Sequence, residues 1–406
     1  MINKVTELKL KVRNKGYSGE VSRKLLKELV SLNGRIGFSG YTKNDFVERS
    51  HGVLTYSPTN IVNNKIVNYK NDTYISQDKY KESPEIMVKN NDILFVKTGS
   101  TLGKSALVRN LTEPATINPQ LIVIKTIHVD SDYLAVYLLT DSIQKQVFQV
   151  KIGGAVPKLT ETEIGKFVVK LPPLPEQTAI GSLFRTLDDL LASYKDNLTN
   201  YQSLKVTMLS KMFPKVGQTV PEIRLDGFEG EWENKILSEV TNITMGQSPK
   251  SENYTDNPND YILVQGNADI KDKQVVPRLW TTEVTKMAEI GDIILTVRAP
   301  VGDIGKTDYN VVIGRGVAAI KGNDFIFYTL EKMKMTGFWN KFSTGSTFES
   351  ISSNDIKEAI IQIPTLEEQK AIGAYFSNLD NLIVAHQEKI SQLETLKKKL
   401  LQDMFI

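Results

Sequence analysis

One segment of this chain occurs twice, and the repeat limits the possible folds more than any other feature. Residues 171–214 begin LPPLPEQTAIGSLFRTLDDLL and residues 363–406 begin IPTLEEQKAIGAYFSNLDNLI, and they align without a gap at an offset of 192, with 16 of 44 positions identical. Upstream the similarity is confined to islands, such as NDILFVKTGSTLGKS at Asn91 and GDIILTVRAPVGDIGKT at Gly291. Duplicated units usually pack about a pseudo-two-fold axis. We therefore expect two modules that share a scaffold and display different loops.

The repeated segment has the pattern of a long helix. Apolar residues recur every three or four positions from Leu187 to Met212 and, with His386 interrupting the pattern, from Leu379 to Met404. Such spacing forms one apolar stripe, which must be buried against another helix. A helix of about 34 residues would be roughly 50 Å long, too long to pack inside one small domain. We expect the two helices to pair antiparallel, with these residues in the shared seam: Tyr194, Tyr201, Ile390 and Leu393.

The segments between the helices have a different texture. Short β-branched runs such as residues 93–96 and 292–297 are bounded by turn residues, which is typical of strands. We predict an α+β/α fold with two mixed α/β globular domains separated by two long helices packed as an antiparallel coiled coil, in a pseudo-two-fold internal repeat. The predicted segments are residues 1–172 and 214–365 for the globular domains, and residues 173–213 and 366–406 for the helices.

Composition excludes several classes of protein. The 406 residues include no cysteine, so disulfides and thiolate sites are excluded. The three histidines, His51, His128 and His386, are too scattered for a His-rich metal cluster. The chain has neither a signal-peptide pattern at its start nor a stretch of 18 apolar residues. We expect a cytoplasmic protein with no metal site and no membrane segment.

Charge is distributed unevenly along the chain. Residues 1–172 contain 25 Lys and Arg against 16 Asp and Glu, a net charge of +9, whereas residues 214–365 contain 16 against 21, a net charge of −5. A basic surface attracts phosphate whatever the base sequence. The first module is therefore expected to supply more of the attraction to nucleic acid, and the second to depend on directed contacts.

The doubled motifs carry a family resemblance. An L-P-P-L-x-E-Q-x-A-I stretch opens a long helix twice, each time after a G-x-x-G-E motif and a D-I-L or D-I-I motif. Over essentially the whole chain this order resembles the specificity subunit of a type I restriction-modification system. The first copy departs from the pattern at Val21, where the second has Trp232, and the second copy has IPTLEEQ for LPPLPEQ.

The resemblance implies a function and a set of partners. Each globular domain would be a target recognition domain that reads one half of a bipartite site in double-stranded DNA, and the paired helices would dock two methyltransferase subunits. Endonuclease and translocase subunits would complete the complex. S-adenosylmethionine, ATP and magnesium would be bound by those partners, so we expect no cofactor on this chain.

Candidate DNA contacts are polar residues in glycine-rich turns. Such turns let the backbone approach phosphates and present short polar groups to base edges in the major groove. Arg298 and Arg315 are the strongest candidates for base reading. The candidates in the first domain are Arg35, Tyr41, Lys43, Lys97, Ser100, Lys104, Gln120, Lys151 and Lys158. Those in the second are Gln247, Ser248, Lys250, Arg298, Lys306, Arg315, Lys341 and Ser346.

A Glu-Gln pair opens each predicted helix. A carboxylate there suits the positive end of the helix dipole, so helix capping is one interpretation. The other is that the pairs form a docking surface for the methyltransferase. The four residues are Glu176, Gln177, Glu368 and Gln369.

No catalytic motif is complete. GSTLGKS at Gly99 has three residues between its first glycine and the Gly-Lys pair, where a phosphate-binding P-loop has four. Asn118-Pro119-Gln120 is the nearest match to the base pocket of a methyltransferase, and no glycine-rich cofactor loop accompanies it. We expect a non-catalytic subunit. The alternatives are a coiled-coil adaptor that binds only proteins and a nucleotide-dependent nuclease.

Overall fold

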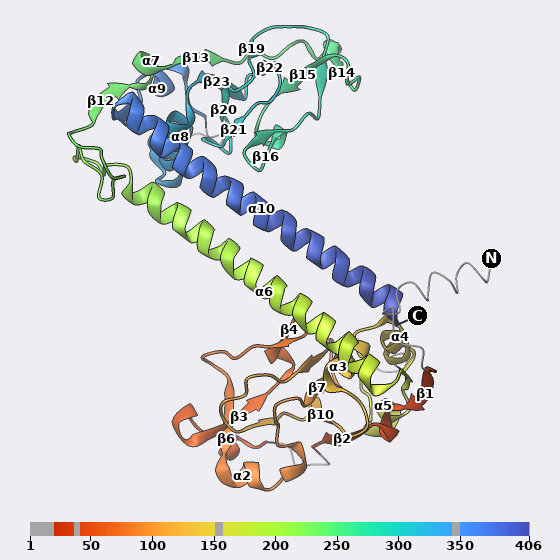
Figure 1. The fold of residues 1–406 in the computed structure, drawn as a ribbon. Coiled ribbons are helices and arrows are strands. Elements are labelled where there is room, and N and C mark those ends of the chain that lie inside the picture. Colours follow the sequence, from red (N-terminus) through yellow and green to blue (C-terminus); the bar gives the residue numbers. More distant parts are fainter. Residues whose placement is uncertain (1–19, 36–40, 151–156, 343–349, 406) are drawn as a thin grey trace. The chain divides into compact units, whose positions relative to one another are not determined.

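The structure, a computed structural model, describes residues 20–35, 41–150, 157–342 and 350–405. The chain forms two compact units. Unit 1 comprises Met1–Tyr194 and Lys389–Ile406, and unit 2 comprises Lys195–Glu388. The two long helices, α6 (Leu174–Lys211) and α10 (Leu366–Met404), each contribute residues to both units (Figure 1). The compact units divide the chain inside both long helices, whereas the predicted segments divide it near the ends of these helices.

A central sheet has the same four-stranded antiparallel core in both units. Its strand order is β2-β10-β7-β8 in unit 1 and β13-β23-β20-β21-β17-β16 in unit 2. The middle strands β7 and β20 are buried along their whole length, as their continuous apolar sequences require. The strands are β2 (Val30–Gly34), β7 (Ile93–Val96), β8 (Ser105–Leu107), β10 (Leu121–Thr126), β13 (Asn242–Met245), β16 (Ile270–Lys271), β17 (Gln274–Val275), β20 (Ile293–Thr296), β21 (Ile304–Lys306) and β23 (Val317–Lys321).

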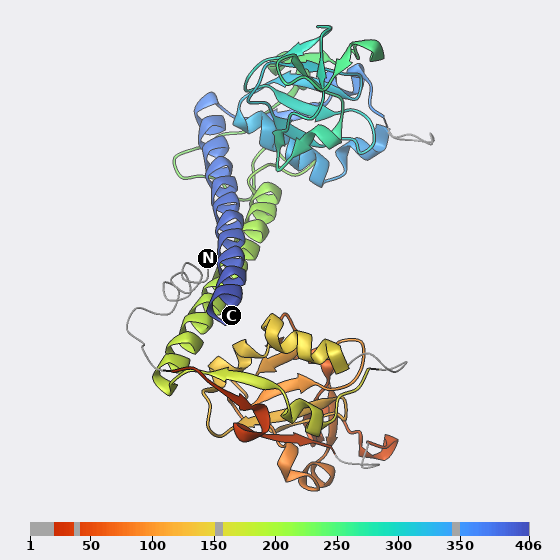
Figure 2. The ribbon, with the colours of Figure 1, turned by 90° about the vertical axis from the view of Figure 1, so that its right-hand side faces the viewer.

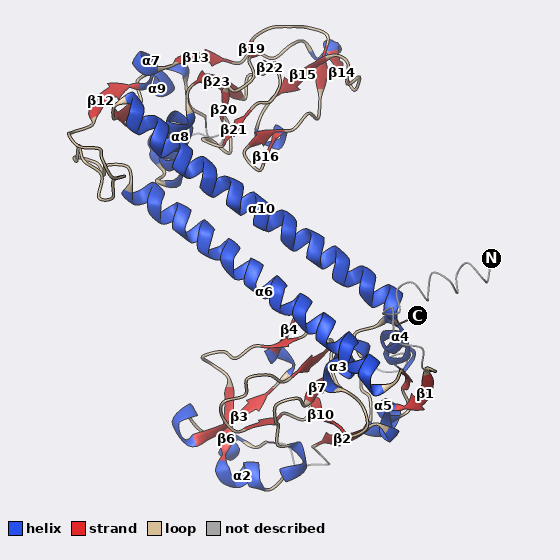
Figure 3. Ribbon diagram, viewed as in Figure 1, coloured by secondary structure: helices blue, strands red, loops and turns tan. Residues whose placement is uncertain are grey.

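Smaller sheets and short helices complete each globular part (Figure 3). Unit 1 has sheets β6-β3-β9, β4-β5 and β1-β11, formed by β1 (Ser22–Leu25), β3 (Gly52–Tyr56), β4 (Ile61–Val62), β5 (Lys65–Ile66), β6 (Thr73–Ser76), β9 (Ala115–Ile117) and β11 (Val168–Leu171). Unit 2 has sheets β14-β18-β15-β22-β19 and β12-β24, formed by β12 (Glu233–Ile236), β14 (Tyr254–Thr255), β15 (Tyr261–Val264), β18 (Trp280–Thr281), β19 (Met287–Ala288), β22 (Val311–Ile313) and β24 (Ile360–Ile363). The short helices are α2 (Gln77–Lys81), α3 (Ser131–Tyr137), α4 (Asp141–Val150), α5 (Glu161–Gly165), α7 (Leu237–Val240), α8 (Asp324–Met335) and α9 (Ser353–Lys357).

Both long helices help to close the core of each unit. In unit 1 the start of α6 supplies Phe184, and the residue after α10 is Phe405, whose ring centroid lies 5.9 Å from that of Phe184. In unit 2 the start of α10 supplies Phe376, and the chain just after α6 supplies Phe213, 6.1 Å away. Each core therefore contains the beginning of one long helix and the end of the other.

The long helices run antiparallel within each unit. In unit 1, Leu187, Leu191 and Tyr194 of α6 pack with Ile390 and Leu393 of α10. In unit 2 the rings of Tyr201 and His386 lie 5.0 Å apart. The views in Figures 1 and 2 agree with this pairing. The predicted seam is confirmed, as is the predicted fold class of two mixed α/β parts with paired helices.

A Lys–Asp ion pair recurs across the helix pair; its lysine is buried in unit 2, and the pair is half-buried in unit 1. In unit 2, Lys205 Nζ lies 2.6 Å from Asp380 Oδ1, and in unit 1 Lys397 pairs with Asp188 at the repeat-equivalent positions. Burial lowers the pKa of Lys205, which is only 5% exposed. A buried charge that loses its partner is strongly destabilising, so such a pair disfavours other registers of the two helices.

The described part of the chain contains no helix that is both long enough and apolar enough to span a membrane.

Phe405 provides a test of this core. Replacing a buried phenylalanine by alanine typically costs about 3–5 kcal/mol. In Phe405→Ala, hydrogen exchange should therefore accelerate in β7 and β10 of unit 1 more than in β20 and β23 of unit 2. Leu396→Ala, an exposed position on α10, serves as the control and should leave both sheets protected. Equal loss of protection in both units would contradict the assignment of Phe405 to the core of unit 1.

Candidate nucleic-acid interface

One edge of the central sheet gathers several candidate residues in unit 1. Strands β2 and β7 end at this edge and β10 begins there, because Gly34 pairs with Ile122 and Val96 with Leu121. The turn between β7 and β8 and the residues before β10 therefore lie together. Thr98 forms a bridge with Lys158, which brings a third segment to the same place. The exposed candidates at this edge are Ser100, Lys104, Gln120 and Lys158.

Two candidates in unit 1 are buried. The Lys97 side chain is 8% exposed, and its Nζ lies 2.7 Å from Glu161 Oε1. Burial alone would raise the pKa of Glu161, but the hydrogen bond and charge of Lys97 outweigh it and hold that pKa below its usual range. Lys97 therefore neutralises Glu161, and the predicted phosphate contact is wrong for this residue. Arg35 is also buried, with its guanidinium 4.2 Å from the ring centre of Tyr41.

Tyr41 forms a hydrogen bond within the fold of unit 1. Its hydroxyl donates a hydrogen bond of 2.6 Å to Ile117 O at the end of β9. Burial raises the pKa of the Tyr41 phenol, so it remains a neutral donor. The Tyr41 hydroxyl therefore has a structural role in the fold.

Unit 2 repeats the edge with other side chains. Met245 pairs with Ala318 and Thr296 with Val317, so β13 and β20 end where β23 begins. The backbone contacts also correspond. The Val297 N–H donates to Gly316 O in unit 2, as the Lys97 N–H donates to Gln120 O in unit 1. Arg298 forms a bridge with Ser350, as Thr98 does with Lys158. The candidates that this edge brings together are Gln247, Ser248, Arg298 and Arg315.

Close backbone packing fixes the position of Arg315. A Cβ on Gly246 would lie 2.1 Å from Gly314 O, and one on Gly316 would lie 2.0 Å from Gln265 O, so both positions require glycine. The Arg315 N–H donates to Ser248 Oγ at 3.1 Å. The exposed arginine therefore projects from a rigid turn.

The two Gly-Lys pairs that align in the sequence are not equivalent in the structure. The strand register pairs Ile93 with Leu107 and Ile293 with Lys306, so Lys306 takes the place of Leu107. Lys306 lies at the opposite end of β20 from Arg298 and forms an ion pair with Asp324. The structure therefore places Lys306 away from the edge that carries Arg298 and Arg315. Asp303 takes the place of Lys104, because Lys104 O and Asp303 O accept the equivalent N–H groups.

The remaining candidates are exposed or lie outside the described residues. Lys43, Lys250 and Lys341 are exposed, and Lys341 Nζ lies 3.9 Å from the ring centre of Phe338. The N–H of Lys250 donates to Glu283, which lowers the pKa of that carboxyl. Lys151 and Ser346 lie outside the described residues.

The Glu-Gln pairs are structural. Glu368 accepts two hydrogen bonds from Arg224, of 2.9 and 2.7 Å, and is 1% exposed. Gln177 accepts the N–H of Asp130 and donates to Pro172 O. Gln369, half-buried, donates to Pro364 O in the same way. Burial contradicts a docking role for three of the four residues: Glu176, Gln177 and Glu368.

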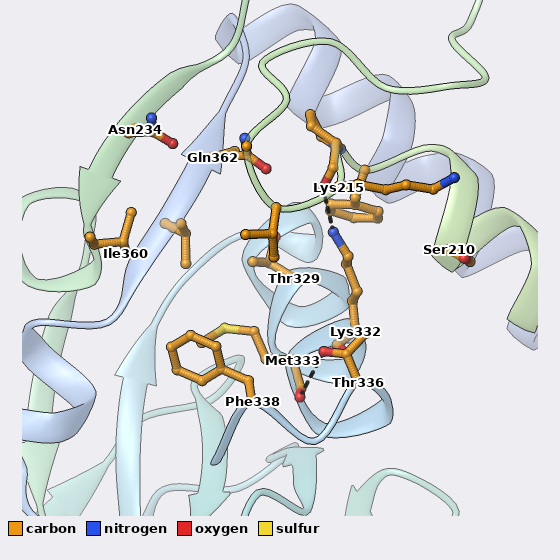
Figure 4. A pocket seen from close by; sticks show the side chains of 15 residues that line it. Ser210, Lys215, Asn234, Thr329, Lys332, Met333, Thr336, Phe338, Ile360 and Gln362 are labelled. Carbon is orange, nitrogen blue, oxygen red and sulfur yellow. Dashed lines mark hydrogen bonds between the residues drawn. The ribbon is translucent and has the colours of Figure 1, made fainter. Parts of the chain in front are cut away.

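Unit 2 also contains an apolar pocket of about 580 Å³ (Figure 4). It lies between the end of α6, α8 and β24, and its walls include Phe213, Met333 and Phe338. Lys332 Nζ donates to Pro214 O at 2.8 Å, and burial lowers the pKa of Lys332. Among the 15 lining residues there is no carboxylate or imidazole, so the pocket favours apolar contact.

Comparison with known sequences identifies relatives of both halves. Residues 26–201 and 229–395 match the family model of the type I restriction modification DNA specificity domain. A Methanocaldococcus jannaschii protein named as the MjaX type I restriction enzyme specificity subunit is 28% identical over 344 residues, which cover 81% of this chain and 80% of that protein. The MjaVIII specificity subunit of the same organism is 24% identical over 78% of this chain and 79% of its own length.

Solved structures share the fold. The type I restriction-modification S subunit from M. genitalium is 14% identical with a TM-score of 0.62, and the match covers 98% of both chains. A chain solved in work on complex assembly and conformational transition of the type I R-M system is 24% identical with a TM-score of 0.53, over 96% of this chain and 99% of that one. Since the family model matches most of both halves, this chain belongs to the type I restriction modification DNA specificity family.

Proposed function

We propose that this chain recognises the DNA sequence for a type I restriction-modification complex, and that each unit reads one half of a bipartite double-stranded site. The observation that carries the proposal is the repeated sheet edge. Its backbone hydrogen bonds are the same in both units, whereas its exposed side chains differ. A repeated scaffold with different displayed groups suits the recognition of two different half-sites.

The side chains at the two edges suit different kinds of contact. Unit 1 exposes Lys104 and Lys158, which are flexible point charges suited to phosphate. Unit 2 exposes Arg298 and Arg315, whose planar guanidinium matches the two acceptors of a guanine edge. This division agrees with the charges of +9 and −5 on the two globular segments.

The repeat also supports two copies of one partner. A single exposed leucine is common on a protein surface. Here, however, exposed leucines recur at the same repeat positions, 192 residues apart. Unit 1 exposes Leu174, Leu190 and Leu396, and unit 2 exposes their equivalents Leu366, Leu382 and Leu204. We assign these positions to the docking of two methyltransferase subunits.

The chemistry would belong to the partners. In this proposal the chain is non-catalytic and acts in the cytoplasm. Methyltransferase subunits bind S-adenosylmethionine, and endonuclease and translocase subunits bind ATP and magnesium. The supporting observation is that the described candidates at the two edges are amides, hydroxyls and cations, which are groups that bind DNA.

Independent reading of the half-sites can be tested with the assembled complex. Arg315→Ala should remove discrimination at one base pair of one half-site and cost about 1–3 kcal/mol on the cognate site, because alanine cannot donate the two hydrogen bonds that arginine makes to guanine. Gln120→Ala should relax only the other half-site. Sequencing of the positions methylated in a random DNA library gives both results. Relaxation of both halves by either variant would contradict separate reading.

Phosphate attraction by unit 1 predicts a change in salt dependence. Lys104→Gln with Lys158→Gln should weaken binding to cognate and random duplexes alike. The slope of log affinity against log salt should become shallower by about 0.9 for each phosphate that the protein no longer neutralises. Lys166→Gln is the matched control, because Lys166 is exposed but lies away from the edge. The next residue, Phe167, accepts a hydrogen bond from the Leu26 N–H, and Leu26 precedes the start of β2, whereas the edge lies at the end of β2. A weakening confined to the cognate duplex would assign these lysines to base reading instead.

Docking at the repeated leucines predicts a change in stoichiometry. Leu190→Ser with Leu396→Ser should leave one methyltransferase per chain, and Leu382→Ser with Leu204→Ser should remove the other copy. Native mass spectrometry counts the bound subunits. Leu183→Ser is the control, because Leu183 is exposed but its repeat equivalent, Tyr375, is half-buried. Two bound copies in every variant would place the docking surface elsewhere.

A further inference from the structure

We infer that Arg278 of unit 2 reads a guanine in the DNA, and that the buried carboxylate of Asp269 positions it. The inference rests on the proposed function and extends it by naming a specificity-determining residue.

Asp269 is a buried carboxylate that accepts three hydrogen bonds. It is 2% exposed and ends the short helical turn Asn267–Asp269. Its Oδ2 accepts the N–H of Gln265 at 2.7 Å and that of Gly266 at 3.1 Å. Its Oδ1 accepts Arg278 Nε at 3.0 Å. One carboxylate therefore holds both the backbone of a turn and an arginine side chain.

The contact leaves the outer edge of the guanidinium available. The side chain of Arg278 is 61% exposed, and Asp269 contacts it through Nε, at its inner edge. The two Nη groups lie at the other edge, which has the spacing to donate to two adjacent acceptors. A guanidinium fixed through Nε also loses less conformational freedom when it binds, which favours specific recognition.

The turn that contains Asp269 packs directly against the recognition edge. The Gly314 N–H donates to Val264 O at 2.8 Å, and Gly316 approaches Gln265 O so closely that no Cβ fits between them. These two glycines flank Arg315. The turn of Arg315 therefore rests on the backbone that Asp269 holds, and the same carboxylate holds Arg278.

Unit 1 has the same turn with a different exposed residue. Asn60 corresponds to Asp269 at an offset of 209 and accepts the Ser57 N–H at 2.9 Å. Asn60 O accepts the N–H of Val67, as Asp269 O accepts that of Val276, both at 2.9 Å. At this offset Arg278 corresponds to Tyr69, which is 42% exposed.

The comparison of the two units distinguishes base reading from phosphate contact. The buried residue keeps its role in holding the backbone, whereas the exposed residue changes from tyrosine to arginine. A phosphate contact is useful in either half-site and gives no reason for such a change. A base contact must change when the half-site changes.

The test measures discrimination by the complex assembled with its methyltransferase partner. Affinity is measured on the cognate duplex and on duplexes with each base pair of the half-site replaced in turn. Arg278→Ala should weaken cognate binding about 5- to 150-fold and abolish the penalty for replacing one G·C pair. Arg278→Lys should lose the same discrimination, because an ammonium has no planar fork. Lys271→Ala, an exposed charge in the adjacent hairpin, is the matched control and should discriminate normally.

A guanine analogue identifies the contacted atom. With 7-deazaguanine at that position, which lacks the N7 acceptor, the wild-type complex should bind more weakly, and Arg278→Ala should show no further loss. Equal weakening of cognate and scrambled duplexes by Arg278→Ala, with normal behaviour of Arg278→Lys, would identify a phosphate contact and overturn the inference.

Asp269→Asn tests the positioning role. Unit 1 already has asparagine at this place, so the turn should fold and the melting temperature should be unchanged. Discrimination at the same G·C pair should nevertheless fall, because a neutral amide no longer orients the guanidinium. Unchanged discrimination would overturn the role of Asp269. A wild-type complex without any sequence preference would refute the proposed function itself, whereas normal discrimination by Arg278→Ala would refute this inference alone.

Discussion

The packing of the end of each long helix into an aromatic cluster is the interaction on which the rest of the structure depends. Phe213 and Phe405 occupy the same repeat position, and each packs against the first turns of the other long helix, at Phe376 and Phe184. Both helices must therefore continue unbroken for 38 and 39 residues to reach these clusters. The antiparallel seam and the Lys–Asp pairs across it follow from this requirement.

The recognition edges illustrate how a duplicated fold acquires two specificities. The backbone is held by features that both units retain, such as the N–H groups of Lys97 and Val297 and the buried side chains of Asn60 and Asp269. Because these contacts do not involve the exposed side chains, the exposed positions can change without loss of the fold. Tyr69 and Arg278 form one such pair of positions.

Sequence patterns predicted the helices better than the site. The apolar period of α6 and α10 is a local signal, so the seam at Tyr194 and Leu393 could be placed from the sequence. The burial of Lys97 depends on Glu161, 64 residues away, and no local pattern reveals it. The equivalence of Lys306 was misjudged because a Gly-Lys match does not determine which residues pair across the strands. Arg278 was missed since its anchor, Asp269, acts through the fold of a turn.

The aromatic cluster of unit 1 also imposes an order on folding during synthesis. Domains generally fold as units, from the N-terminal end, while the chain is being made. Here the core of unit 1 includes Phe405, which is synthesised only after the whole of unit 2. Until Phe405 has been synthesised, Tyr133 and Tyr137 in the core of unit 1 therefore lack this aromatic packing partner. Unit 2 is one continuous stretch, Lys195–Glu388, which is made before Phe405. Unit 1, whose synthesis begins first, is therefore completed last.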